Sequence, residues 1–195
     1  MLIPGKGYWL RASGDGQIIL NSEMETSRIS NIYSAEIPVN LSINENENNI
    51  SKDVMINSGW NIVGLPLAVE NNSYEIVFPP ANNNTLFMYD GMYLLDSTLA
   101  LGKGYWLRFD SAGNSTITGN SINELIISLN EGWNLIAGIS NPIDISLIQD
   151  PDGVIVPSTV YGFSTEGYSN TEIIEPGKGY WIRANNPGTI TLYDN

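Results

Sequence analysis

The sequence contains no cysteine and no histidine among its 195 residues. Without cysteine, the chain forms no disulfide, has no thiolate nucleophile and offers no sulfur ligand to structural zinc. Without histidine, it lacks the side chain that most often serves as general base or transition-metal ligand. A Ser-His-Asp or Cys-His enzyme is therefore excluded for this chain alone. Because no pair of carboxylates stands in a recognisable catalytic context either, we expect a protein that is not an enzyme.

Positive charge is also scarce. Lys and Arg number 8 against 21 Asp and Glu, which gives a formal net charge of −13. An acidic surface repels the phosphates of nucleic acids and anionic membranes, so we expect neither as a partner. The sequence has no apolar run of about 18 residues, the length that would span a bilayer. We therefore expect no membrane insertion.

Two short motifs recur along the chain. The string "GKGYWLR" stands at 5–11 and 102–108 and returns as "GKGYWIR" at 177–183, while "GWN" stands at 59–61 and 132–134. All five tryptophans of the chain fall in these motifs. The two GWN copies lie about 75 residues apart, and so do the second and third GKGYW copies. This spacing is typical of tandem structural repeats.

The motifs predict three units. Residues 51–121 and 122–195 each hold GWN followed by GKGYW, whereas residues 1–50 hold GKGYW alone and form a partial repeat. Within that partial repeat, apolar residues alternate with others over 36–43, which is typical of a half-buried strand. Either this inserted strand completes the first unit, or the chain is a fragment of a longer repeat array.

Turn residues punctuate the sequence between runs rich in Ile, Val, Tyr, Trp and Thr. This pattern predicts an all-β fold, in which tandem repeats of about 75 residues form β-sandwich- or barrel-like units, the first of them incomplete. The nearly continuous apolar run from Trp133 to Ile139 indicates a strand covered on both faces. Residues 141–153 do not alternate cleanly, and we expect at most one helical turn there.

The GKGYW motif reads as a strand. Alternation places successive side chains on opposite faces, so that Lys103, Tyr105 and Leu107 share one face and Gly104, Trp106 and Arg108 share the other. The first glycine of the motif suits a tight turn or a positive φ. We interpret the second glycine as leaving room beside a large neighbouring ring.

Six of the eight basic residues lie in the three GKGYW motifs, and this placement has two interpretations. We favour core packing of the tryptophans, with Lys and Arg covering the ring edges and pairing with carboxylates, because large aromatic side chains are mostly buried. Alternatively, rings and guanidinium groups form a sugar-binding platform. The candidate ligand-binding residues are then Tyr93, Tyr168, Trp106, Arg108, Trp181 and Arg183.

One acidic loop, "DPDG" at 150–153, offers carboxylates to a cation. Asp150 and Asp152 are the residues that calcium would use, but the loop does not complete the EF-hand pattern. Acidic surface loops are usually only solvated. We therefore expect no catalytic residue, no cofactor and no dedicated metal site, with calcium as the one ion for which ligands are present.

The order of motifs resembles segments of known proteins. "SGWNIVGLPL" at 58–67, an aromatic "YDGMY" hairpin and "LGKGYWLRF" at 101–109 are similar to tandem β-repeat segments of large secreted bacterial cell-surface proteins. The resemblance implies an extracellular or cell-surface location in a bacterium and a modular, non-catalytic part. It carries no assigned binding residues.

Three functions are consistent with these observations. The leading hypothesis is a repeat module acting in structure, assembly or adhesion, with partners that are proteins, through self-association or neighbouring modules, or glycans. The second is a carbohydrate-binding module of a secreted enzyme. The third is a fibre subunit in which a strand of one chain completes the sheet of the next.

Overall fold

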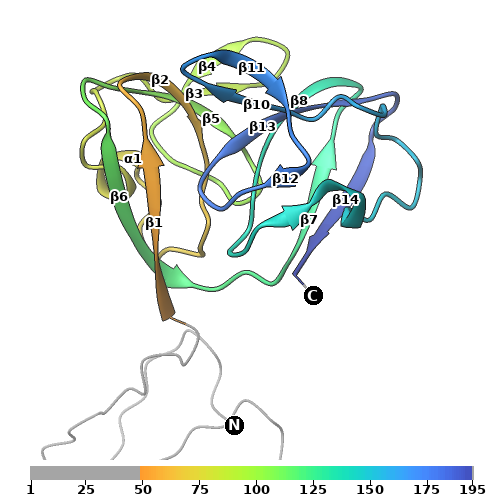
Figure 1. The fold of residues 1–195 in the computed structure, drawn as a ribbon, viewed down its shortest axis with the longest axis horizontal. Coiled ribbons are helices and arrows are strands. Elements are labelled where there is room, and N and C mark those ends of the chain that lie inside the picture. Colours follow the sequence, from red (N-terminus) through yellow and green to blue (C-terminus); the bar gives the residue numbers. More distant parts are fainter. Residues whose placement is uncertain (1–48, 195) are drawn as a thin grey trace, which may run out of the picture. The chain divides into compact units, whose positions relative to one another are not determined.

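A computed structural model describes residues 49–194, which belong to one compact unit within Glu45–Asn195 (Figure 1). This part of the chain consists of strands, with one short α-helix and one 3₁₀ turn. The prediction of a mostly β protein is confirmed. The partial repeat predicted at 1–50, with its inserted strand at 36–43, lies almost wholly outside the described residues, as does the first GKGYW motif.

The first half of the described chain forms two antiparallel sheets. Strands β1 and β6 pair along their whole length, and a four-stranded sheet has the order β2-β5-β3-β4. A single helical turn, α1, follows β2. The elements are β1 (Asn49–Ile56), β2 (Gly59–Val63), α1 (Tyr74–Val77), β3 (Phe87–Tyr89), β4 (Tyr93–Leu95), β5 (Tyr105–Phe109) and β6 (Gly113–Asn120).

The second half repeats this pairing. Strand β7 pairs with β14, and the four-stranded sheet has the order β11-β10-β13-β8, with β12 and β9 as an added short pair. None of the sheets of residues 49–194 closes into a barrel, so that alternative is wrong for this part of the chain. The elements are β7 (Glu124–Leu129), β8 (Gly132–Ala137), β9 (Ile143–Asp144), the 3₁₀ turn η1 (Ile145–Leu147), β10 (Tyr161–Ser164), β11 (Gly167–Asn170), β12 (Ile173–Ile174), β13 (Gly179–Ala184) and β14 (Gly188–Tyr193).

The two helical turns differ in how visible they were in the sequence. The turn η1 falls inside 141–153, where at most one turn was expected, and the Asp144 carboxylate accepts a hydrogen bond from Ser146 N at 2.8 Å at its start. Helix α1 was not predicted. It is only four residues long, too short for a helical period to show, although Tyr74 and Val77 are buried.

Each half has its own apolar core. The first contains Phe78, Leu107 and Phe109, and the second contains Ile136, Ile182 and Ile190. The inward face of β5 follows the predicted alternation, because Tyr105 and Leu107 are buried while Arg108 is exposed. The prediction of a strand covered on both faces is confirmed only for the second half of β8, where Ile136 faces the second core and Leu135 belongs to a separate small cluster. It is wrong for the first half, because Trp133 is exposed.

The glycine-rich starts of the second and third GKGYW motifs, at 102–104 and 177–179, join the two halves. Gly104 N donates to Leu135 O at 2.9 Å, and Ala137 N donates to Gly102 O at 3.0 Å. In the reciprocal contact, Gly64 N donates to the carbonyl oxygen of Gly177 at 3.1 Å. The rest of each motif then pairs with the GWN strand of its own half, β5 with β2 and β13 with β8. Each of these two motifs therefore forms backbone hydrogen bonds with both repeats.

This crossing explains the two glycines. Gly102 and Gly177 both have φ of 75°, which confirms the positive φ expected at the first position. The interpretation of the second glycine is wrong, because the group beside it is not an aromatic ring. A Cβ on Gly104 would lie 2.6 Å from the carbonyl oxygen of Ile136, so the space is needed by the backbone of the other repeat rather than by a ring.

We predict that Gly104→Ala destabilises the protein by about 2 kcal/mol, because the added methyl group forces the two repeats apart. Chemical denaturation of the complete chain measures the change. Gly113→Ala is the matched control, since a Cβ there meets nothing within 4 Å. That variant should stay within about 0.5 kcal/mol of the wild type, as exposed substitutions do. Equal stability of the two variants would contradict the crossing contact.

Candidate functional site

Aromatic side chains gather on the faces of the two four-stranded sheets that point away from the cores. Strands β2 to β5 contribute one set and strands β8, β10, β11 and β13 the equivalent set. Contacts between rings connect both sets, which we call the aromatic surface: Trp60, Phe87, Tyr89, Tyr93, Trp106, Trp133, Tyr161, Phe163, Tyr168 and Trp181.

The GWN motif places one tryptophan of each set. Gly59 has φ of 89° and makes the turn into β2, and the Asn61 side chain braces it by accepting from Asn57 N at 2.9 Å and donating to Asn57 O at 2.8 Å. Asn134 repeats both bonds with Asn130. Trp60 therefore stands on the outer face while its neighbour Asn61 holds the turn. The sequence analysis did not predict that this asparagine braces the turn, although its recurrence in both GWN motifs was a signal of it.

Four rings of the aromatic surface are strongly exposed. The exposed fractions are 42% for Trp60, 40% for Trp133, 53% for Tyr93 and 55% for Tyr168. The tryptophans of the GKGYW motifs are better covered: Trp181 is buried and Trp106 is half-buried. The two large cores contain instead the motif tyrosines Tyr105 and Tyr180. Trp181 forms a third, small buried cluster with Ile62 and Leu135, and Trp106 packs against it, so the favoured core packing is confirmed for Trp181 and in part for Trp106.

The aromatic surface is built jointly by both repeats. The rings of Tyr89 and Trp181 meet edge to face, with centroids 4.8 Å apart. The equivalent pair, Phe163 and Trp106, has a separation of 4.7 Å. Such pairs stabilise by about 0.5–1.5 kcal/mol each beyond the burial of their area. The rings thus reinforce the backbone pairing between the repeats.

Two clefts open in this surface, and equivalent residues of the two repeats line them. Cleft A has a volume of about 390 Å³ and is lined by Tyr89, Tyr93, Trp133, Tyr161, Tyr168 and Trp181. Cleft B has a volume of about 440 Å³ and is lined by Trp60, Phe87, Tyr93, Trp106 and Phe163. Both linings are wholly aromatic and come from both repeats, and Tyr93 belongs to both clefts.

The two candidate arginines lie beside the clefts. In the strand register, Arg108 is directly opposite Trp60, and Arg183 is directly opposite Trp133. Residues opposite each other in an antiparallel pair project from the same face, so each exposed guanidinium adjoins an exposed indole. All six sequence-predicted ligand residues are thus at or beside the aromatic surface, together with Trp60 and Trp133, which the sequence did not single out.

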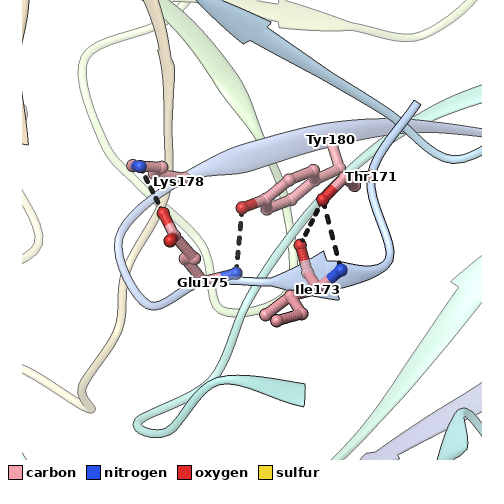
Figure 2. Close-up of polar contacts among 5 residues, drawn as sticks. All are labelled: Thr171, Ile173, Glu175, Lys178 and Tyr180. Atoms are coloured by element: carbon pink, nitrogen blue, oxygen red, sulfur yellow. Dashed lines mark hydrogen bonds and ion pairs between the residues drawn. The ribbon is translucent and has the colours of Figure 1, made fainter. Parts of the chain in front are cut away.

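The expected pairing of basic residues with carboxylates holds for one lysine. Between residues 49 and 194 the single ion pair joins Lys178 to Glu175, at the loop before β13 (Figure 2). The predicted pairing of Arg108 and Arg183 with carboxylates is therefore wrong within this part of the chain. Within residues 49–194, no carboxylate holds either guanidinium group.

Buried tyrosine hydroxyls fasten the loops that lead into β5 and β13. The Tyr180 hydroxyl accepts a hydrogen bond from Glu175 N at 2.9 Å (Figure 2), and the Tyr105 hydroxyl accepts one from Ala100 N at 3.0 Å. Burial raises the pKa of Tyr180 to about 12 and also raises that of Tyr105. These hydroxyls serve the fold, because they hold the glycine turns that cross between the repeats.

A third cavity of about 430 Å³ lies beside this loop. Unlike the clefts, it is lined largely by polar side chains, among them Ser169, Glu172 and Lys178. Gly162 also lines it, and the equivalent residue of the first repeat is Met88, whose side chain packs against the first core. The two repeats therefore differ here, whereas they match at the aromatic clefts.

The DPDG loop uses its first carboxylate internally. The two carboxylate oxygens of Asp150 accept hydrogen bonds from Val154 N and Ile155 N, each at 2.9 Å. Asp152 is exposed on the turn. In the described part of the chain, no group of three or more acidic side chains is arranged to hold a metal ion.

Comparisons with known proteins give no match: no family model fits the chain, and no curated protein or solved structure is significantly similar to it. No helix within residues 49–194 has the length and apolar character needed to cross a membrane.

We predict that the free energy of unfolding falls as pH rises from 10 to 12, and that Tyr180→Phe reduces this fall. Tyr180 is neutral in both states below pH 10, but above it the unfolded chain ionises first because the folded-state pKa is about 12. Denaturation at several pH values measures the slope. At pH 7 the variant should lose about 1 kcal/mol with the hydrogen bond from Glu175 N. Identical slopes for both proteins would contradict the assignment.

Proposed function

We propose that this chain is a non-catalytic extracellular repeat module of a bacterial surface or secreted protein, and that it acts in adhesion through the aromatic surface. In this proposal the repeats of about 75 residues are β-sandwich-like units in a tandem array whose first unit is incomplete. The observation that carries it is the exposure of Trp60, Trp133, Tyr93 and Tyr168 around two clefts.

Folding alone does not account for these exposed rings. Both repeats already have an apolar core on the opposite faces of their sheets. Exposed apolar patches that are rimmed by polar residues mark interaction sites on soluble proteins. Trp, Tyr and Arg are the residues most enriched among those that contribute most of the binding energy of an interface. The aromatic surface and the two arginines beside it bring these three residue types together. Their wholly aromatic linings supply contact area rather than carboxylates for acid–base chemistry, which supports binding over catalysis.

The pairing between repeats supports a second candidate, assembly by strand exchange. Gly64 and Gly104 show that a glycine-rich segment of one repeat bonds to a strand of the other. The same pairing between separate chains would build a fibre. Strand exchange gives polymers that grow with protein concentration and disappear when residues 1–20 are removed, as light scattering would show.

We predict that the labelled full chain binds a component of a panel of immobilised glycans, extracellular-matrix proteins and bacterial cells. Trp60→Ala with Trp133→Ala should weaken this binding at least tenfold, since truncating a central aromatic residue of an interface commonly costs about 2 kcal/mol. Ile126→Ala is the matched control, because this exposed side chain lies on β7, outside the aromatic surface. A stable monomer that binds nothing, or equal binding by both variants, would contradict adhesion through these rings.

A further inference from the structure

We infer that the ligand of the aromatic surface is a neutral carbohydrate chain whose sugar rings occupy cleft A and cleft B together. The inference rests on the proposed function and specifies its partner. It follows from three properties of the clefts: their lining, their charge and the wall that they share.

The lining suits flat, partly apolar rings. Both clefts fall within the roughly 300–1,000 Å³ of small-ligand sites, and their walls are ring faces and edges without a charged side chain. A pyranose ring has apolar C–H faces that stack on such walls. Its hydroxyl edge needs partners at the rim, where Tyr93 and Tyr168, both more than half exposed as residues, each carry a hydroxyl group, a group able to donate and accept hydrogen bonds.

Charge selects a neutral ligand. A cage of aromatic rings would attract an alkylammonium ion, but Arg108 and Arg183 put a positive charge beside Trp60 and Trp133 at the two rims. A polyanion would be drawn to these arginines, yet it meets a chain with a net charge of −13. A neutral sugar avoids both repulsions, and each guanidinium offers it several hydrogen-bond donors.

The shared wall links the two clefts. Tyr93 lines both of them, and each cleft combines a tryptophan of one repeat with a ring of the other, Trp181 with Tyr89 and Trp106 with Phe163. A ligand that places consecutive sugar rings in both clefts gains from the high effective concentration of the second ring. We therefore expect oligosaccharides to bind at least tenfold more tightly than their constituent monosaccharides.

Titration of the full chain by tryptophan fluorescence and calorimetry tests this inference. The probes are dextran, galactomannan and a soluble β-glucan, with their monosaccharides and short oligosaccharides. Hyaluronan, choline chloride and decaproline represent the anionic, cationic and proline-rich alternatives. We expect at least one neutral polymer to bind, Tyr93→Ala to weaken its binding at least tenfold, and Tyr93→Phe, which keeps the ring, to weaken it less than fivefold. Tyr193→Ala, on β14, is the control and should bind like the wild type.

Several outcomes would overturn the inference. One is binding of choline, hyaluronan or decaproline with no binding of the neutral polymers. Another is equal affinity for a monosaccharide and its oligosaccharides, which would contradict joint occupation of the clefts. If no neutral polymer binds but the panel still shows adhesion that depends on Trp60 and Trp133, the carbohydrate inference fails and the proposed function stands. If those tryptophans affect no binding at all, both fail.

Discussion

The arrangement of residues 49–194 depends on backbone hydrogen bonds that run between the two repeats in this part of the chain. Gly104 N reaches Leu135 O in the second repeat, and Gly64 N reaches Gly177 O in the reciprocal direction. The crossing requires glycine because a Cβ on Gly64 would lie 2.1 Å from the Cβ of Ala137, and a Cβ on Gly104 would lie 2.6 Å from the carbonyl oxygen of Ile136. The segment that precedes the inner strand of each sheet, β5 or β13, is consequently bonded to the edge strand of the other sheet, β8 or β2. These hydrogen bonds fix the positions of the side chains on the outer faces of the two sheets.

The aromatic surface depends on these hydrogen bonds between the repeats. Because the bonds hold the two sheets together, the hairpins β3–β4 and β10–β11 lie beside each other (Figure 1). Tyr89 then contacts Trp181, and Phe163 contacts Trp106. Neither cleft could form from one repeat alone. A repeated strand thus produces a paired site: its inner tyrosines complete the cores, and its outer tryptophans line clefts that both repeats share.

Local pattern revealed the strands but not the contacts between them. The alternation around Trp106 and the duplication of GWN and GKGYW were readable because they depend on a period of two and on sequence identity. The partner of Gly104 was not, since it lies in a strand of the other repeat, and no local rule specifies such a neighbour. Likewise, the local pattern did not single out Trp60. Its exposure follows from the turn that Asn61 braces, a side-chain effect that periodicity does not report.

Native-state amide hydrogen exchange tests the central claim most directly, because it reads the bonds between the repeats one by one. The account predicts that the amides of Gly64, Gly104 and Ala137 exchange as slowly as core amides of β5 and β13 and open together with them. Fast exchange at these three amides, at the rate of exposed loops and with the cores of both repeats still protected, would contradict it.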